Sequence, residues 1–340
     1  MKRVVTFGEI MLRLNPEGYL RFTQANRFEA SYAGGEANVA VSLAGYGVNA
    51  VFVTKVPAHE IGQAAVNELR RFGVDTNFII RGGDRLGVYY VEKGASQRAS
   101  KVIYDRSNSA IALAKPGEFD WKAIFSGADW FHFTGITPAL SDNAAAACME
   151  AVKTARELGL RISCDLNYRK KLWDSETAGR IMGTLMRFVD VCIANEEDAA
   201  DVFGIRADKS DVTRGELNRD GYISVARQLS ERFGFNTVAI TLRGSISASD
   251  NNWSGMLYQD GKSYFAPEYA VHIVDRVGGG DSFGGTLIYC LLEGYKNQRI
   301  INLAAAASCL KHSIEHDFNL TSLQEVETLA AGNASGRVQR

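Results

Sequence analysis

The sequence predicts an α/β fold in which a doubly wound, mostly parallel sheet is flanked by helices. Short apolar runs alternate along the chain with longer segments of helical periodicity, and repeated strand–helix–strand units with right-handed crossovers build such a sheet. The later apolar runs are almost wholly apolar, as expected of parallel strands buried on both faces. At 340 residues the chain suits one large α/β unit with an accessory element.

The strands of this sheet are expected at six apolar runs, at residues 4–10, 50–56, 128–135, 160–167, 190–195 and 236–242. Helices are expected at residues 36–47, 60–73, 142–159, 196–204 and 223–234. Many of these helical segments end in Gly, the usual residue at a helix C-terminus. Strand and helix therefore alternate over most of the chain.

Two segments near the N-terminus interrupt this alternation. Residues 11–33 and 84–110 contain stretches such as LGVYYVEKG and RASKVIYDR, in which apolar and polar residues alternate between turn signals. This pattern predicts a small antiparallel β lid, inserted in two pieces. Residues 244–266 predict hairpins with an Asp-Gly turn. We therefore expect a single domain over residues 1–330 that carries the lid, and a frayed tail over residues 331–340.

Charge and composition exclude several classes of protein. The formal net charge is -1, without the basic surplus that nucleic-acid binding requires. The five cysteines are widely spaced and form no CxxC pair, so neither a zinc site nor a disulfide framework is indicated. No run approaches the roughly 18 uncharged apolar residues of a membrane span, and no signal-peptide pattern occurs. We expect a cytoplasmic protein without membrane or nucleic-acid partners.

The stretch VDRVGGGDSFGG, at residues 274–285, carries the first functional signal. Its glycine spacing fits neither GxxxxGK[ST] nor GxGxxG, which disfavours a P-loop and a dinucleotide-dependent enzyme. Residues 282–295 have helical spacing, so the glycines lie at a helix N-terminus, where free N–H groups bind anions.

Asp281, which follows these glycines, has two possible roles. It can cap the helix, which stabilises by about 0.5–2 kcal/mol. Alternatively, it can act as general base on a hydroxyl group that attacks a phosphate held by the N–H groups. Three consecutive glycines exceed what a cap needs, and this excess favours anion binding.

A second signal lies at residues 32–47, YAGGEANVAVSLAGYG. Gly34 and Gly35 precede a helix, and Asn38 follows one turn in, where backbone and amide can hold a sugar. Together the two stretches resemble the signatures of the ribokinase-like (phosphofructokinase B-type) carbohydrate kinases, GG-x-x-N-x-A and D-x-x-G-x-G-D. The second runs from Asp275 to Asp281, and the resemblance covers nearly the whole chain.

The resemblance implies a ribokinase-like fold and assigns roles around the glycine run. Asp281 is the implied general base that deprotonates a sugar hydroxyl. The backbone N–H groups of Gly278, Gly279, Gly280 and Asp281 are the implied anion hole for the γ-phosphate, although Gly279 stands where the family more often has Ala. Asp275 corresponds to the family's ligand of a monovalent cation such as K+.

Two further segments resemble the family's ATP-binding elements. Residues 195–204, NEEDAADVFG, are similar to its N-x-x-E motif, which implies Asn195 at the ATP site and Asp198 as a water-mediated Mg2+ ligand in place of Glu. Glu196 and Glu197 could equally be first-turn helix charges. Residues 241–245, TLRGS, resemble the nucleotide loop and place Thr241, Arg243 and Gly244 beside ATP.

Residues 8–14, 92–110, 164–173 and 311–319 resemble the subgroup of 2-keto-3-deoxygluconate kinases. Because that substrate is a sugar acid, the site must hold a carboxylate, for which Arg106 and Arg169 can supply charge-assisted contacts. The remaining substrate contacts implied are Glu9, Gly34, Gly35, Asn38, Tyr89, Tyr104 and Asp317. Asn167 and Arg169 follow a strand's carboxyl end, the usual ligand edge of such a sheet, and can also contact ATP.

The expected function is ATP- and Mg2+-dependent phosphorylation of the terminal hydroxyl of 2-keto-3-deoxygluconate, beneath a lid that excludes water. A galactonate-type epimer is an equally open substrate. The alternatives are a kinase of another sugar, such as fructose, and a non-catalytic sugar or nucleotide sensor. An exposed apolar lid face, with Val88, Tyr90, Val102 and Ile103 as candidates, predicts a homodimer formed through the lids.

Overall fold

The computed structural model describes residues 1–195, 197–206 and 219–333. Its main sheet has the strand order β14-β13-β12-β11-β10-β9-β1-β4, and β15 also pairs with β13. These strands are β1 (Arg3–Phe7), β4 (Asn49–Val53), β9 (Trp130–Thr134), β10 (Arg161–Asp165), β11 (Val191–Ala194), β12 (Thr237–Ser245), β13 (Asp250–Gln259), β14 (Lys262–Phe265) and β15 (Tyr269–His272). The six predicted strands are confirmed, and they form the parallel part of the sheet, from β4 to β12.

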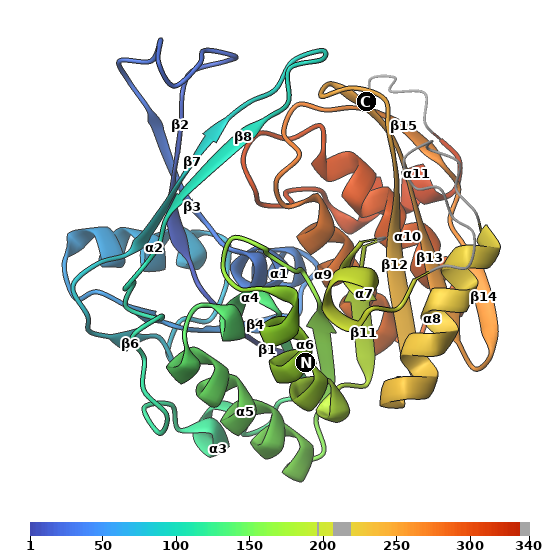
Figure 1. The fold of residues 1–340 in the computed structure, drawn as a ribbon, viewed down its shortest axis with the longest axis horizontal. Helices are drawn as coiled ribbons and strands as arrows, with labels where there is room; N and C mark the ends of the chain where they lie inside the picture. Colours follow the sequence, from blue (N-terminus) through green and yellow to red (C-terminus); the bar gives the residue numbers. More distant parts are fainter. Residues whose placement is uncertain (196, 207–218, 334–340) are drawn as a thin grey trace.

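Helices cover both faces of the main sheet (Figure 1). The predicted ones are α1 (Gly35–Gly45), α2 (Glu60–Arg71), α5 (Asp142–Glu157), α7 (Asp198–Phe203) and α8 (Arg219–Phe233), and the glycine run opens α9 (Gly279–Leu292). The sequence did not single out α3 (Trp121–Ile124), α4 (Ile136–Ala139), α6 (Ser175–Leu185), α10 (Asn297–Lys311) or α11 (Leu323–Ala330). A short 3-10 turn, Met186–Phe188, follows α6.

The parallel strands are buried on both faces, as their apolar sequences predict. Along β1, Val5 and Phe7 join one hydrophobic cluster, while Val4 joins the cluster on the other face. On β9, Phe131 and Phe133 belong to the first cluster and Trp130 to the second. The side chains at these positions are fully shielded from solvent, so the sheet is a rigid platform. Only its edges are accessible to a ligand.

The segments expected to form the lid contribute a separate four-stranded sheet. Its strands are β2 (Met11–Asn15), β3 (Glu29–Ala33), β7 (Gly87–Glu92) and β8 (Lys101–Asp105), in the order β3-β2-β7-β8. The outer pairs are antiparallel, as expected, but the central β2–β7 pair is parallel, so this sheet is mixed. The difference follows from the crossover through α1 and α2, which returns the chain to the lid in the same direction. The lid sheet stands away from the main sheet (Figure 1).

The hairpins expected at residues 244–266 are present. β12 and β13 pair antiparallel, and β13 pairs with β14 across the Asp260–Gly261 turn. Both turn residues have positive φ, 52° and 72°, as a two-residue Asp-Gly hairpin requires. A short parallel pair, β5 (Lys55–Val56) with β6 (Ile80–Arg81), lies outside the two larger sheets.

Within the described residues, no helix combines the length and the apolar character that crossing a membrane needs. Of the expectations made from sequence, that for Glu196 and most of that for the tail 331–340 fall outside the residues that the structure describes.

Candidate active site

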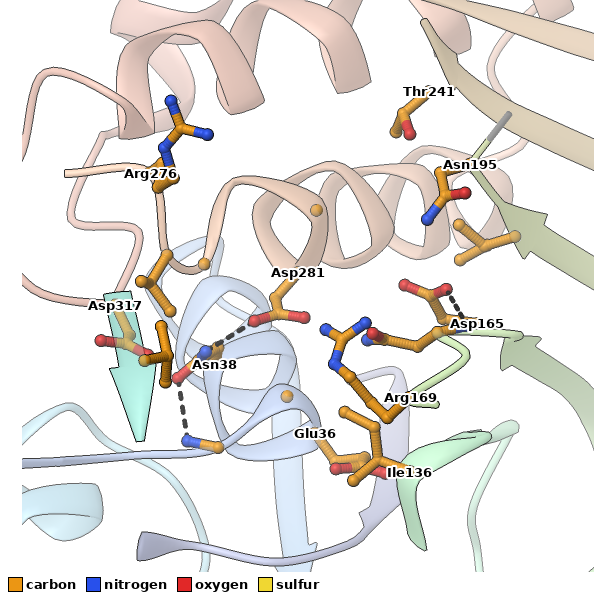
Figure 2. Close-up of a pocket in the computed structure, with 18 of the residues that line it drawn as sticks. Glu36, Asn38, Ile136, Asp165, Arg169, Asn195, Thr241, Arg276, Asp281 and Asp317 are labelled. Carbon is orange, nitrogen blue, oxygen red and sulfur yellow. Dashed lines mark hydrogen bonds between the residues drawn. The ribbon is translucent and has the colours of Figure 1, made fainter. Parts of the chain in front are cut away.

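A pocket of about 430 Å3 lies between the main sheet and the lid (Figure 2). Its wall includes residues beyond the carboxyl ends of β10 and β11, residues of the second half of β12, the start of α9 and the inner face of the lid. This is the edge at which open α/β sheets usually bind ligands.

Most of the residues predicted for the site line this one pocket, although they come from distant parts of the chain. They are Glu9, Gly34, Gly35, Asn38, Tyr89, Tyr104, Arg106, Asn167, Arg169, Asn195, Thr241, Arg243, Gly278, Gly280, Asp281 and Asp317. Four predicted residues are not part of its wall: Gly244, Gly279, Asp198 and Asp275. Gly244 packs beside Asn252 of the neighbouring strand.

Asp281 does not cap its helix, so this possible role was wrong. Helix α9 begins at Gly279, earlier than predicted, and its N-cap is Gly278 with the left-handed φ of 85° and no side-chain cap. The Asp281 carboxylate instead accepts a hydrogen bond of 2.6 Å from the Asn38 amide nitrogen. In Figure 2 it lies between Asn38 and Arg169.

Burial raises the pKa of Asp281 to about 7, even though the Asn38 hydrogen bond opposes the shift. The nearby charges of Asp317 and Glu36 raise it further, and that of Arg169 lowers it. A carboxylate with this pKa can accept a proton effectively near neutral pH. The chemistry therefore suits a general base.

The turn before α9 presents unpaired N–H groups. No acceptor in the described part of the chain takes the N–H of Gly278, Gly280 or Asp281, whereas Gly279 donates to the Arg276 carbonyl at 3.5 Å. The α-carbon of Gly279 faces the His312 ring, where a Cβ would lie 2.6 Å away, and Gly279 is not part of the pocket wall. Three of the four predicted anion-hole donors are thus free for a phosphate at a helix N-terminus.

Glycine is required at Gly278 but not at Gly280. A Cβ on Gly278 would lie 1.9 Å from the Asp317 carbonyl oxygen, and its φ is left-handed; a Cβ on Gly280 would meet nothing within 4 Å. We therefore expect Gly278→Ala to lower the free energy of unfolding by about 1–3 kcal/mol. Gly280→Ala should leave stability unchanged or raise it by up to about 1 kcal/mol, because Ala favours helix.

Urea unfolding of both variants measures this difference, and each serves as the other's control. The Gly280 variant should fold normally yet lose kinase activity, because its methyl group crowds the unpaired N–H groups. Equal stability of the two variants would contradict the observed turn geometry.

The lid side of the pocket is a connected polar wall. Glu9 accepts a hydrogen bond of 2.8 Å from the Arg106 Nε and one of 2.6 Å from Ser109. The Arg106 guanidinium lies 5.3 Å from the centre of the Tyr104 ring, which stacks on Tyr89 at 6.0 Å. The sequence suggested that Arg106 is a cation available to the substrate. In the structure it is already paired with Glu9, so a substrate carboxylate must share it with Glu9.

Arg169, unlike Arg106, forms no ion pair with a carboxylate of the described residues. It donates to the carbonyl of Tyr168 at 3.1 Å. Figure 2 shows it between Asp281 and Asp165, and its charge lowers the pKa of both carboxyl groups. It is thus available to a bound anion.

Asp198 supports the loops of the site from behind. Its carboxylate accepts the N–H groups of Tyr168 at 3.1 Å and Asn195 at 3.2 Å, and burial raises its pKa to about 6. The Mg2+ role expected for Asp198 therefore lacks support. No cluster of three or more potential metal-ligating side chains occurs among the described residues. Mg2+ usually binds through substrate phosphates and one or two carboxylates, for which Asp165 and Glu197 line the pocket.

The pocket also contains residues that were not predicted from the sequence, among them Glu36, Asp165, Asn251, Trp253, Arg276 and His312. Asp165 ends β10, and desolvation raises its pKa well above the usual value, together with the charges of Asp198 and Asp281. The sequence did contain a signal for Asp165, because it lies two residues before the predicted site residue Asn167. Glu36 stands inside the GGEAN stretch, where it accepts hydrogen bonds of 2.8 and 2.6 Å from Thr134 and Thr137 hydroxyls.

Unpaired N–H groups at a helix N-terminus, beside a carboxylate of raised pKa and under a β lid, suit phosphoryl transfer to a small hydroxyl compound. Comparison with known proteins agrees with this class. The chain belongs to the pfkB family of carbohydrate kinases, whose family pattern matches residues 1–314. The ribokinase-like fold and kinase class predicted from the sequence are thereby confirmed.

Three known proteins illustrate the similarity. The crystal structure of 2-dehydro-3-deoxygluconokinase from Thermotoga maritima is 51% identical, with a TM-score of 0.94 over 97% of this chain and 98% of that chain. A 2-dehydro-3-deoxygalactonokinase of Haloferax volcanii is 33% identical over 333 residues, 98% of each chain. An E. coli ribokinase II bound to ATP and Mg2+ has a TM-score of 0.81, covering 97% and 99% of the two chains, but only 21% identity, which shows likeness of fold alone.

Proposed function

We propose that this chain is an ATP-dependent sugar-acid kinase that phosphorylates the terminal hydroxyl of 2-keto-3-deoxygluconate, giving 2-keto-3-deoxy-6-phosphogluconate. The observation that carries the proposal is the presence of Arg106 and Arg169 in the same pocket as Asp281. Guanidinium groups bind a substrate carboxylate through bidentate hydrogen bonds. A neutral sugar has no carboxylate for such contacts. The names of the Thermotoga and Haloferax relatives, which both specify keto-deoxy sugar acids, agree with this choice.

In the proposed reaction, Asp281 takes the proton of the terminal hydroxyl. The hydroxyl oxygen then forms a bond to the γ-phosphorus of ATP while the bond to the bridging β,γ-oxygen breaks, and ADP leaves. Charge that develops on the transferred phosphoryl group is met by the N–H groups of Gly278, Gly280 and Asp281. Closure of the lid would exclude water and so protect ATP from hydrolysis.

The nucleotide would lie on the side of the pocket formed by the ends of β11 and β12. Asn195, Thr241 and Arg243 line the pocket there, and Asn167 and Arg169 belong to the same wall. Membership of the pfkB family of carbohydrate kinases supports ATP as the phosphate donor. Mg2+ bound to the ATP phosphates would neutralise their charge.

A coupled assay of ADP formation over a panel of acceptors tests the proposal. The panel contains 2-keto-3-deoxygluconate, its galactonate epimer, gluconate and fructose. We expect kcat/KM for the keto-deoxy acids to exceed that for fructose by about 100-fold, since a charge-assisted contact is worth about 1.5–3 kcal/mol. A better rate with fructose would overturn the sugar-acid assignment, and no turnover with any acceptor would favour a sensor.

We further propose that two chains pair through their lids. Leu20, Phe28 and Ile103 of the lid segments are 41%, 40% and 43% exposed, and a partner would cover them. Val88, Tyr90 and Val102 are only partly exposed, and Tyr90 contacts the Phe28 ring. Light scattering should report twice the chain mass of 37.2 kDa, and Ile103→Glu should reduce it; a monomeric wild-type protein would refute pairing.

A further inference from the structure

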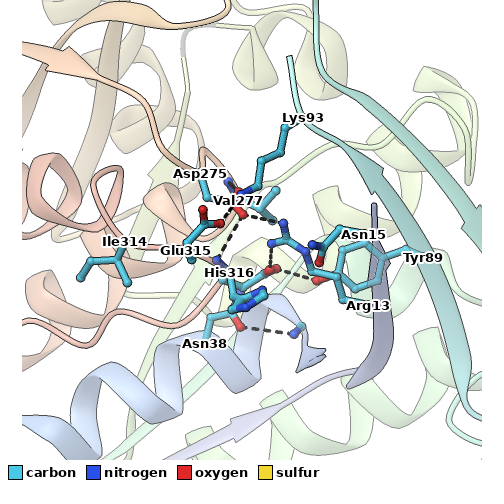
Figure 3. Close-up of polar contacts among 12 residues, drawn as sticks. Arg13, Asn15, Asn38, Tyr89, Lys93, Asp275, Val277, Ile314, Glu315 and His316 are labelled. Carbon is cyan, nitrogen blue, oxygen red and sulfur yellow. Dashed lines mark hydrogen bonds and ion pairs between the residues drawn. The ribbon is translucent and has the colours of Figure 1, made fainter. Parts of the chain in front are cut away.

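A buried cluster of charges lies next to the glycine turn, and Figure 3 shows its members Arg13, Tyr89 and Asp275 together with Val277, which precedes Gly278. Arg13, on lid strand β2, donates hydrogen bonds to the carboxylates of Asp275 and Asp317, and all three side chains are almost wholly buried. Tyr89 donates to the other oxygen of Asp317 at 2.7 Å. Burial alone would lower the pKa of Arg13, but the charges of Asp317 and Asp275 raise it overall, so the guanidinium stays charged.

A second buried cation completes the cluster. Lys311, the last residue of α10, is 0% exposed. Its ammonium donates to the backbone carbonyl of Asp275 at 3.3 Å and to that of Ile314 at 3.2 Å. Burial lowers the pKa of Lys311, and the nearby carboxylates of Asp275 and Asp317 oppose that shift. The cluster therefore brings together two basic and two acidic side chains.

The monovalent cation implied by the family resemblance does not fit these groups. Such ions bind carboxylate and backbone carbonyl oxygens. Here the Asp275 carboxylate accepts from Arg13 and from the N–H groups of Val277 at 3.1 Å and His316 at 3.2 Å. The carbonyl oxygens of Asp275 and Ile314 already accept from Lys311. An additional ion would leave an uncompensated charge in a desolvated cluster, which is costly.

We propose that the Lys311 ammonium, together with Arg13, is a built-in replacement for a monovalent cation behind the anion hole. Asp275 binds the Val277 N–H, one residue before Gly278, and Gly278 packs against the Asp317 carbonyl. Arg13 thus fixes both carboxylates that frame this turn, and Lys311 fixes the backbone carbonyls of Asp275 and Ile314 beside them. Lys311 is a positioning residue: it holds the unpaired N–H groups in place and contacts no substrate.

The wild-type protein gives the first test, because the proposal predicts that its activity does not depend on K+. Phosphorylation is measured with the Tris salt of ATP and MgCl2, in KCl or in tetramethylammonium chloride at equal ionic strength. We expect rates that agree within about twofold, and melting temperatures that agree between the two salts. Strong activation by K+, or a K+-specific rise in the melting temperature, would overturn the proposal.

Lys311→Ala gives the second test. Removing the side chain opens a space lined by the carbonyl oxygens, so kcat in tetramethylammonium should fall by about 10- to 100-fold, as expected when reacting groups are misplaced. Adding K+ or NH4+ should restore part of the lost kcat. Lys311→Met fills the space and should not be rescued. Lys153→Ala, which removes an exposed lysine from α5, is the matched control and should behave as wild type.

Full activity of Lys311→Ala in every salt would overturn the proposal. If that variant does not fold, the wild-type salt comparison still decides. The measurements of phosphorylation rate depend on the proposed function, whereas the measurements of melting temperature do not. Absence of turnover with all sugar acids would therefore reject the substrate assignment, and the melting temperatures would continue to test the role of Lys311.

Discussion

Replacing Asp281 by Asn is expected to lower kcat by a factor of about 10²–10⁴, the range that general-base catalysis contributes. The amide cannot take a proton from the sugar hydroxyl. Its oxygen can still accept the Asn38 hydrogen bond that the carboxylate accepts at 2.6 Å, so the start of α9 should keep its structure. ATP affinity, measured by calorimetry, should therefore stay within about twofold of wild type.

Asp142→Asn is the matched control for this variant, because it removes an exposed carboxylate from the first turn of another helix, α5. Its kcat should be unchanged. The pH profile gives an independent check, since burial raises the pKa of Asp281 to about 7. Below that pH the base is protonated, so wild-type kcat/KM should fall about tenfold per pH unit. Unchanged turnover of Asp281→Asn would remove Asp281 from the chemistry.

The parallel sheet could be predicted because its signals are local. Most of each strand is an apolar run. Asn195 follows β11 at once and Asn167 lies two residues after the end of β10, so the ligand edge of the sheet was visible in the sequence. The start of α9 was placed too late because Gly279 and Gly280 are poor helix formers, and the tertiary structure overrides that preference.

What the sequence could not give are contacts between distant positions. Arg13 and Asp275 are separated by 262 residues, and no local pattern shows that one neutralises the other. The same limit applies to Asp198, which is not part of the pocket wall and whose carboxylate binds the N–H of Tyr168, 30 residues earlier. The identity of a carboxylate was therefore visible in the sequence, but the direction in which it points depends on the packing of the whole domain.

Replacing Arg169 by Met is expected to lower kcat/KM for 2-keto-3-deoxygluconate by about 10- to 100-fold, because a charge-assisted contact worth about 1.5–3 kcal/mol is lost. Met retains most of the apolar volume. Lys170→Met is the control, since Lys170 is the adjacent residue, is exposed and does not line the pocket. Fructose should lose less than the sugar acid, because it has no carboxylate for Arg169 to bind.

A second effect of Arg169→Met separates an electrostatic role from a purely structural one. The Arg169 charge lowers the pKa of Asp281, which is raised mainly by burial. Removing that charge must raise the pKa further, so the acid limb of kcat/KM should move above pH 7. Arg169→Lys keeps the charge but loses the planar fork, so it should keep the limb near the wild-type pH while kcat/KM stays reduced. An unmoved limb in Arg169→Met would show that Arg169 does not act on the base.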